Sequence, residues 1–140
     1  RERLLIKKAT LATYISMYTD TITPELGIPT LKKRIEPNLP ISVLLFGMGT
    51  DMHTASLFPG GDNLEEALSN NAPTLLPMRA AGAIEARMTL TAQVLNSSRF
   101  KHLVIFGMEK RTAFEKVIDL PNSIAPISAI LPGASVHWAA

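Results

Sequence analysis

The sequence predicts an α/β fold in which helices flank a mainly parallel sheet. Residues 42–48 and 102–108 are two apolar runs rich in residues that favour strands, and both end in Phe-Gly-Met. Apolar runs of this length are typical of strands buried on both faces of a parallel sheet. Helical patterns alternate with these and other extended segments, which favours an α/β layer architecture. Ligands in such folds bind beyond the carboxyl ends of strands, so we expect a site at the two Phe-Gly-Met turns.

The composition is that of one folded domain, which we expect to span residues 1–140. Of the 140 residues, 46% are hydrophobic and 19% charged, which is enough apolar content for a core and too much for a disordered chain. The longest apolar run is far shorter than a membrane span, and zero cysteines exclude disulfides and cysteine-zinc sites. The net charge of +2 comes from scattered basic residues, so neither a membrane nor a nucleic acid is an expected partner. The cytoplasm is the default location.

The individual elements follow from hydrophobic periodicity and from turn-forming residues. Pro24 lies just inside a helix start with Thr23 as its cap, and Pro37 closes the same helix after Ile35. In chain order, we expect a helix over residues 2–12, a strand over 14–18, a helix over 24–35, a central strand over 42–48, a helix near 64–68, extended segments near 75–79 and 87–91, a short helix near 93–98, a strand over 102–108, a helix over 109–118 and a last strand over 134–138.

The turn after the first apolar run carries the candidate chemistry, and it reads Gly47-Met48-Gly49-Thr50-Asp51-Met52-His53. Glycines let the backbone approach a ligand closely, so the amides of this turn can receive an oxyanion or a phosphate. Asp51 lies two residues before His53, and a carboxylate at this spacing can favour one imidazole tautomer, as a general base requires. In the alternative interpretation, Asp51 caps a helix that begins near Thr54, and His53 is a surface loop residue.

Other chemistries fit this turn less well. A dinucleotide-binding fingerprint would need a third glycine where Met52 stands, and Ser56 lacks the flanking glycines of a serine hydrolase. Neither His102 nor His137 belongs to a ligand-spaced motif with the turn, so we expect no metal. Direct attack by an activated water is the simpler chemistry.

Two cations are candidates for binding an anion. Lys110 stands in the first turn of the helix after Gly107, where a positive charge opposes the helix dipole, which favours a functional reason for its presence. A solvated helix face is the alternative for Lys110. Arg87 fits either a bidentate contact with phosphate or a charge on an edge strand.

Residues 47–60 closely resemble 6-phosphogluconolactonases of the glucosamine-6-phosphate isomerase/6-phosphogluconolactonase family, whose usual pattern here is Gly-Met-Gly-x-Asp-Gly-His-Thr-Ala-Ser-Leu-Phe-Pro-Gly. Further similarity lies in residues 87–91 with 94–96, in residues 107–111, and in residues 126–131 followed by 136–138, in the order of the family. The resemblance implies a Rossmann-like fold. Met52 stands where the family usually has glycine, and a methionine is strained there if the position requires a positive φ.

The resemblance also implies an activity, which is the hydrolysis of 6-phospho-D-glucono-1,5-lactone to 6-phosphogluconate in the pentose phosphate pathway. It implies no cofactor, and a small phosphorylated sugar lactone as the partner. By this analogy His53 activates the water and Asp51 orients His53. The substrate-binding residues that the resemblance implies are Gly47, Gly49, Thr50, Arg87 and Lys110.

Family members begin with a half that carries a Gly-Gly-Ser-Thr-Pro-like phosphate loop and an Asp-Glu-Arg segment, and neither occurs here. We therefore expect the sequence to be the carboxyl-terminal portion, with an incomplete sheet whose exposed apolar surface promotes self-association. One alternative is a sugar-phosphate isomerase or deaminase, although glucosamine-6-phosphate deaminases usually continue the loop as His-Ile-Ala-Phe-Asn-Glu-Pro. Another is a fragment that binds a sugar phosphate without turnover.

Overall fold

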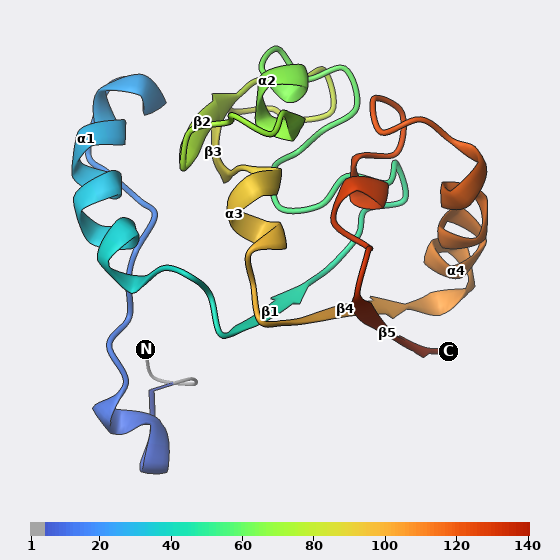
Figure 1. Cartoon of the computed structure of the whole chain (residues 1–140), viewed down its shortest axis with the longest axis horizontal. Coiled ribbons are helices and arrows are strands. Elements are labelled where there is room, and N and C mark those ends of the chain that lie inside the picture. The colour runs from blue at the N-terminus through green and yellow to red at the C-terminus, as the bar shows by residue number, and fades with distance from the viewer. Residues whose placement is uncertain (1–4) are drawn as a thin grey trace.

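The computed structural model describes residues 5–140, which form helices, strands and short 3-10 turns (Figure 1). The helices are α1 (Pro24–Ile35), α2 (Leu64–Leu68), α3 (Ala92–Asn96) and α4 (Gly107–Lys116). The strands are β1 (Val43–Phe46), β2 (Leu75–Met78), β3 (Arg87–Leu90), β4 (Phe100–Phe106) and β5 (Ala134–Ala139). The 3-10 turns span Lys7–Leu11, Glu36–Asn38, Val117–Asp119 and Pro126–Ala129.

These strands form two sheets. A parallel sheet has the order β1-β4-β5, with Val43 opposite Phe100 and Lys101 opposite Ala134. β2 and β3 form a separate antiparallel pair. The prediction of an α/β fold with a mainly parallel sheet is confirmed. The prediction that residues 42–48 form a central strand is wrong for the described residues, because β1 lies at the edge and β4 takes the centre.

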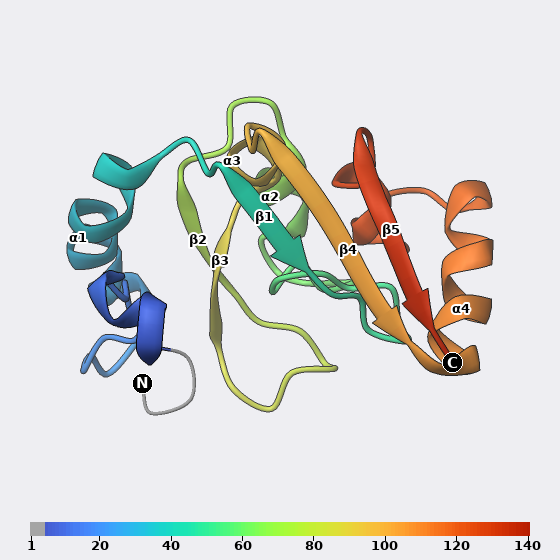
Figure 2. The same ribbon diagram turned by 90° about the horizontal axis from the view of Figure 1, so that it is seen from below.

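The two faces of the parallel sheet differ in what covers them. On one face, Leu103 and Ile105 of β4 join a buried cluster with side chains of α4 and of the 3-10 turn Pro126–Ala129. Figure 2 views the opposite face, which no other element of the described chain covers. On that face Val43 and Leu45 are 58% and 71% exposed. Self-association through this apolar face stays a prediction.

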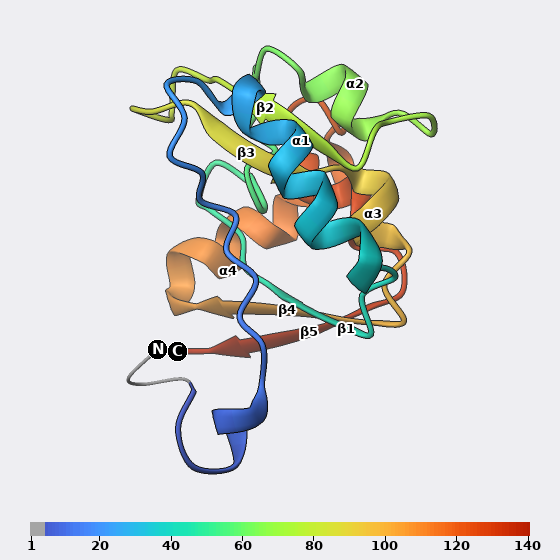
Figure 3. The same cartoon turned by 90° about the vertical axis from the view of Figure 1, so that its left-hand side faces the viewer.

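A second layer lies over the packed face of the sheet. β2, β3, α2 and α3 share a buried cluster that includes Leu57 and Leu95, and Leu44 and Phe46 of β1 pack against it. Helix α1 packs against β2 on the outer side of this layer, where Leu31 is buried (Figure 3). The layer of β2, β3, α2 and α3 is therefore fixed relative to β1 of the parallel sheet.

The structure differs from the sequence prediction mainly at the N-terminal end. The helix expected over residues 2–12 begins outside the described residues, and its described part forms only the 3-10 turn Lys7–Leu11. The segment 14–18 is not a strand, because no other strand pairs with it. The Arg34 side chain of α1 instead donates a hydrogen bond to the Tyr18 carbonyl at 3.0 Å. Periodicity reveals an extended segment but not whether a partner strand lies beside it.

The other expected elements are confirmed, with their ends shifted by a few residues. α1 begins at Pro24 and ends at Ile35, although the Thr23 side chain makes no capping hydrogen bond. β4 begins earlier than expected, at Phe100, and α4 begins at Gly107 inside the Phe-Gly-Met turn. In the part of the chain that the structure describes, every helix is too short or too polar to cross a membrane.

Candidate active site

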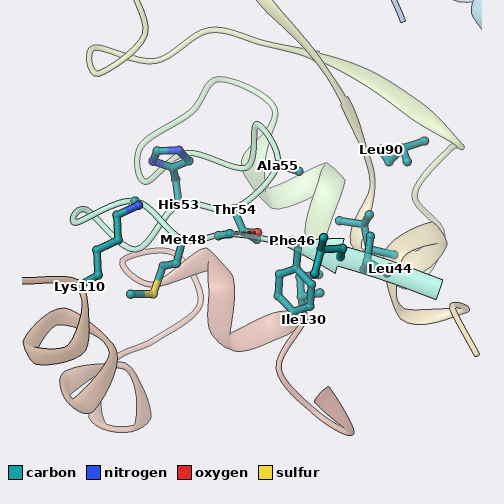
Figure 4. Close-up of a pocket in the computed structure, with 13 residues that line it drawn as sticks. Leu44, Phe46, Met48, His53, Thr54, Ala55, Leu90, Lys110 and Ile130 are labelled. Atoms are coloured by element: carbon teal, nitrogen blue, oxygen red, sulfur yellow. Dashed lines mark hydrogen bonds between the residues drawn. The ribbon is translucent and has the colours of Figure 1, made fainter. Parts of the chain in front are cut away.

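The carboxyl ends of β1 and β4 lie side by side and open onto a hollow. Because the two strands are parallel neighbours, the turns that begin at Gly47 and Gly107 leave the same edge of the sheet, as predicted. The hollow beside this edge has a volume of about 550 Å³. It is lined by Leu44, Leu45, Phe46, Gly47, Met48, Gly49, His53, Thr54, Ala55, Leu90, Leu95, Lys110 and Ile130 (Figure 4). Thr50, Asp51 and Arg87 of the predicted site are not among them.

Asp51 holds the imidazole of His53 in this hollow. His53 Nδ1 lies 2.5 Å from Asp51 Oδ1, which also accepts a hydrogen bond from the His53 backbone amide at 3.3 Å. A carboxylate only accepts hydrogen bonds, so Nδ1–H is the donor to Asp51, and in the neutral imidazole Nε2 then carries the lone pair. The Phe58 ring packs against the imidazole with ring centroids 4.6 Å apart. The His53 side chain is still 32% exposed, so a water or a ligand can reach it.

Backbone hydrogen bonds fix the loop that carries His53. The Gly49 amide donates to the His53 carbonyl, and the Met52 amide donates to the Gly49 carbonyl, each at 3.0 Å. The Met52 carbonyl accepts a hydrogen bond from the Ile127 amide at 3.1 Å. The N–H groups of Gly49, Met52 and His53 are therefore engaged within the loop.

Thr54 is a positioning residue that the sequence did not single out. It is buried, and its Oγ1 donates a hydrogen bond to the Gly47 carbonyl at 2.8 Å, which closes the loop. Thr54 also forms an isolated bridge with Leu57. The alternative in which Asp51 caps a helix near Thr54 is wrong, because no helix begins there. No local pattern marks the Thr54 contact, since it exists only once the loop has closed.

Backbone geometry limits which residues the loop accepts. A Cβ at position 49 would collide with the His53 ring and the Asp51 carboxylate, so a glycine is required where these two side chains meet. Met52 has a φ of +65° and Ala55 a φ of +51°, both in the left-handed region that favours glycine. The strain expected for methionine at position 52 is therefore present, and such a conformation costs on the order of 1–2 kcal/mol per residue.

The two predicted cations lie in different hollows. Lys110 extends from the first turn of α4 toward the loop of His53 and lines the same hollow (Figure 4). Arg87 is exposed at the start of β3 and lines a second hollow of about 580 Å³. Ala55 lines the first hollow and Ser56 lines the second, so this loop lies between the two. His53 and Lys110 therefore line one hollow, and Arg87 lines the neighbouring one.

A buried lysine supports the wall of the first hollow. Lys101 is 8% exposed, and its Nζ donates hydrogen bonds to Asn96 Oδ1 at 2.8 Å and to the Ile130 carbonyl at 2.9 Å. Burial lowers the pKa of Lys101 below its ordinary value of 10.5. Asn96 also donates to the Ala129 carbonyl at 2.8 Å. These bonds tie β4 and α3 to the segment that places Ile130 in the wall.

The other two histidines lie away from the hollow. His102 and His137 stand on β4 and β5, with His102 Nδ1 and His137 Nε2 3.0 Å apart. Within residues 5–140, no three His, Cys, Asp or Glu side chains are grouped so that they could hold a metal ion. Catalysis without a metal or an organic cofactor stays a prediction.

Comparison with known sequences identifies the family. The family model described as "Glucosamine-6-phosphate isomerases/6-phosphogluconolactonase" matches residues 1–138. The chain belongs to this family. It is 34% identical over 145 residues to the 6-phosphogluconolactonase of Rhizobium meliloti, covering 99% of this chain and 62% of that protein. It is 42% identical over 105 residues to the 6-phosphogluconolactonase of Mesorhizobium japonicum, covering 71% of this chain and 44% of that protein.

A solved structure of the family has the same fold. The crystal structure of a 6-phosphogluconolactonase from Shewanella baltica aligns with a TM-score of 0.92 at 28% identity, covering 99% of this chain and 62% of that chain. This family member thus shares nearly all of the fold described above. The chain spans 44% to 62% of the length of these three relatives.

Proposed function

We propose that this chain forms part of a 6-phosphogluconolactonase and that it hydrolyses 6-phospho-D-glucono-1,5-lactone to 6-phosphogluconate. One observation carries the proposal: His53, hydrogen-bonded through Nδ1 to Asp51, lines the same hollow as Lys110. A base that can activate water and a cation that can bind phosphate, in one hollow, suit the hydrolysis of a phosphorylated lactone. Membership of the family and the relatives named 6-phosphogluconolactonase support the choice of substrate. The cytoplasmic location stays a prediction.

In this mechanism His53 is the general base. Its Nε2 takes a proton from a water molecule while the water oxygen attacks the lactone carbonyl carbon. The tetrahedral intermediate then collapses, the bond from that carbon to the ring oxygen breaks, and His53 returns the proton to the ring oxygen. Asp51 keeps the required tautomer and holds the ring in place. Amides of the turn at residues 47–50, other than that of Gly49, stabilise the negative oxygen of the intermediate.

Lys110 binds the phosphate of the substrate in this mechanism. Its ammonium group extends into the hollow from α4, whereas Asp51 and His53 stand on the loop after β1. The two ends of a sugar phosphate can therefore contact two different elements. Arg87 lines the second hollow, so we assign the phosphate contact to Lys110.

A pair of assays on this chain tests the proposal. One measures acid release from 6-phospho-D-glucono-1,5-lactone, and the other measures ammonia release from glucosamine 6-phosphate. We expect acid release above the spontaneous rate and no ammonia. Ammonia release alone would support a deaminase. Binding of 6-phosphogluconate without any turnover would support a chain that holds the ligand but does not catalyse.

A further inference from the structure

The first turn of α4, which carries Lys110, lacks a side-chain cap of its own. Its N-cap residue is Phe106, which makes no side-chain hydrogen bond to the helix. The helix begins at Gly107 with a φ of +80°, a conformation that glycine adopts without strain. Contacts from outside the helix therefore help to fix the position of this turn.

Trp138 makes those contacts. Its indole Nε1 donates a hydrogen bond to the Gly107 carbonyl at 3.0 Å. The guanidinium carbon of Arg111 lies 4.7 Å from the centre of the Trp138 ring, which is a cation-π contact. Gly107 and Arg111 stand on either side of Lys110 in the sequence. One tryptophan side chain thus attaches both ends of the turn that presents Lys110.

Trp138 is itself fixed by the sheet. It lies on β5, in parallel register opposite Ile105 of β4, and Ile105 is buried under α4. β5 ends beside the start of α4, as Figure 2 shows. The position of Lys110 is therefore set relative to the same sheet whose edge carries the loop of His53.

We propose that Trp138 is a positioning residue that holds Lys110 at the hollow and thereby sets the affinity of the site for phosphorylated ligands. The proposal rests on the proposed function, because it takes Lys110 as the phosphate contact. Trp138 acts through its indole N–H, so the aromatic ring alone does not replace it. The effect is specific to ligands that carry a phosphate.

The test compares the wild-type chain with Trp138→Phe, which keeps an aromatic ring under Arg111 and removes the N–H donor. Calorimetry measures the Kd for 6-phosphogluconate and for gluconate, which lacks the phosphate. We expect Trp138→Phe to raise the Kd for 6-phosphogluconate roughly fivefold, the usual effect of one lost hydrogen bond, and to leave gluconate binding unchanged. Phe100→Leu removes an exposed aromatic ring elsewhere on the sheet and serves as the matched control, with no change expected.

A double-mutant cycle with Lys110→Gln separates positioning from general damage. If Trp138 acts through Lys110, Trp138→Phe adds no further loss in the Lys110→Gln background. An equal loss in both backgrounds, or an equal loss for gluconate, would overturn the proposal and leave the proposed function intact. Wild-type affinity in Trp138→Phe would also overturn it. If the wild-type chain shows no binding of 6-phosphogluconate, or if Lys110→Gln binds it as tightly as wild type, the phosphate assignment of the proposed function fails and this proposal fails with it.

Discussion

The two hollows on either side of the loop at Ala55 and Ser56 are built differently. The first lies at the ends of parallel strands, where backbone hydrogen bonds hold the loop and a side-chain hydrogen bond joins His53 to Asp51. The second lies against the segment before α1, and it contains Arg87 together with an acid, Glu85. The edge of the parallel sheet thus brings a histidine and a cation into one hollow, whereas the second hollow brings together a carboxylate and a cation without a histidine. We expect chemistry in the first hollow and little ligand affinity in the second.

The largest effect is expected from removing the base of the first hollow. His53→Ala should lower kcat for lactone hydrolysis about 10²–10⁴-fold, the usual contribution of a general base, with the Kd for 6-phosphogluconate nearly unchanged. Steady-state kinetics measure the loss. His102→Ala changes a histidine on the open face of the sheet and should leave kcat unchanged. Near-wild-type turnover in His53→Ala would remove His53 from the mechanism.

Gly49 tests whether the geometry of the pair matters as much as its presence. Gly49→Ala places a Cβ against the His53 ring and the Asp51 carboxylate, so the imidazole must move. We expect kcat to fall about 10²-fold, as misplacement of a catalytic group by about 1 Å can cause. Gly82→Ala is the matched control, because a Cβ there would meet its nearest neighbour only at 3.9 Å. A Gly49→Ala variant with normal kcat would show that the tight pairing is dispensable.

Substitution of Lys110 and of Arg87 compares the contribution of the two hollows to ligand binding. Lys110→Gln should weaken 6-phosphogluconate binding about tenfold, since it removes a charge-assisted contact with phosphate. Arg87→Gln lies in the other hollow and should change the same Kd less than about twofold, as expected of an exposed charge. Calorimetric titration of both variants measures the difference. Equal losses of affinity in the two variants would mean that one ligand contacts both hollows, and would contradict the assignment of the phosphate to Lys110 alone.

Ala55 tests the strained loop that separates the hollows. Its φ of +51° favours glycine, so Ala55→Gly should raise the free energy of unfolding by about 0.5–1 kcal/mol. Ala86 lines the second hollow and does not have a positive φ, so Ala86→Gly serves as the control and should lower the free energy of unfolding slightly. Urea denaturation of the two variants provides the measurement. A destabilised Ala55→Gly would contradict the strain inferred at this position.

The smallest effect is expected on stability, from the ion pair that holds α1 beside the second hollow. Glu25 forms an ion pair with Arg79 at 2.6 Å, and its own backbone amide and Arg79 lower its pKa below the ordinary 4.5. A lowered carboxylate pKa stabilises the fold above pH 4.5, and this contribution disappears as the pH falls through the folded-state pKa.

We therefore expect Glu25→Gln to be slightly less stable than wild type near neutral pH and equally stable in acid. Thermal unfolding at several pH values measures the difference between the two proteins. A difference that grew toward acid pH would contradict the assigned sign.

Much of the first hollow could be predicted from local sequence. The apolar runs at 42–48 and 102–108 fix two strands, and their shared Phe-Gly-Met endings place Gly47 and Gly107 at one edge of a parallel sheet. The spacing of Asp51 and His53 also brings their side chains together within one short loop. These features depend on residues close in the chain, so the sequence pattern contains them.

The tertiary structure alone decided the rest. The segment 14–18 is not a strand, β1 lies at an edge, and Arg87 lies in a different hollow from Lys110. The contact of Trp138 with Gly107 joins residues far apart in the sequence. Each of these outcomes depends on which distant segments meet, and hydrophobic periodicity carries no information about the partner of a segment. The residue types of the candidate site could therefore be predicted from the sequence, whereas their arrangement depends on long-range packing.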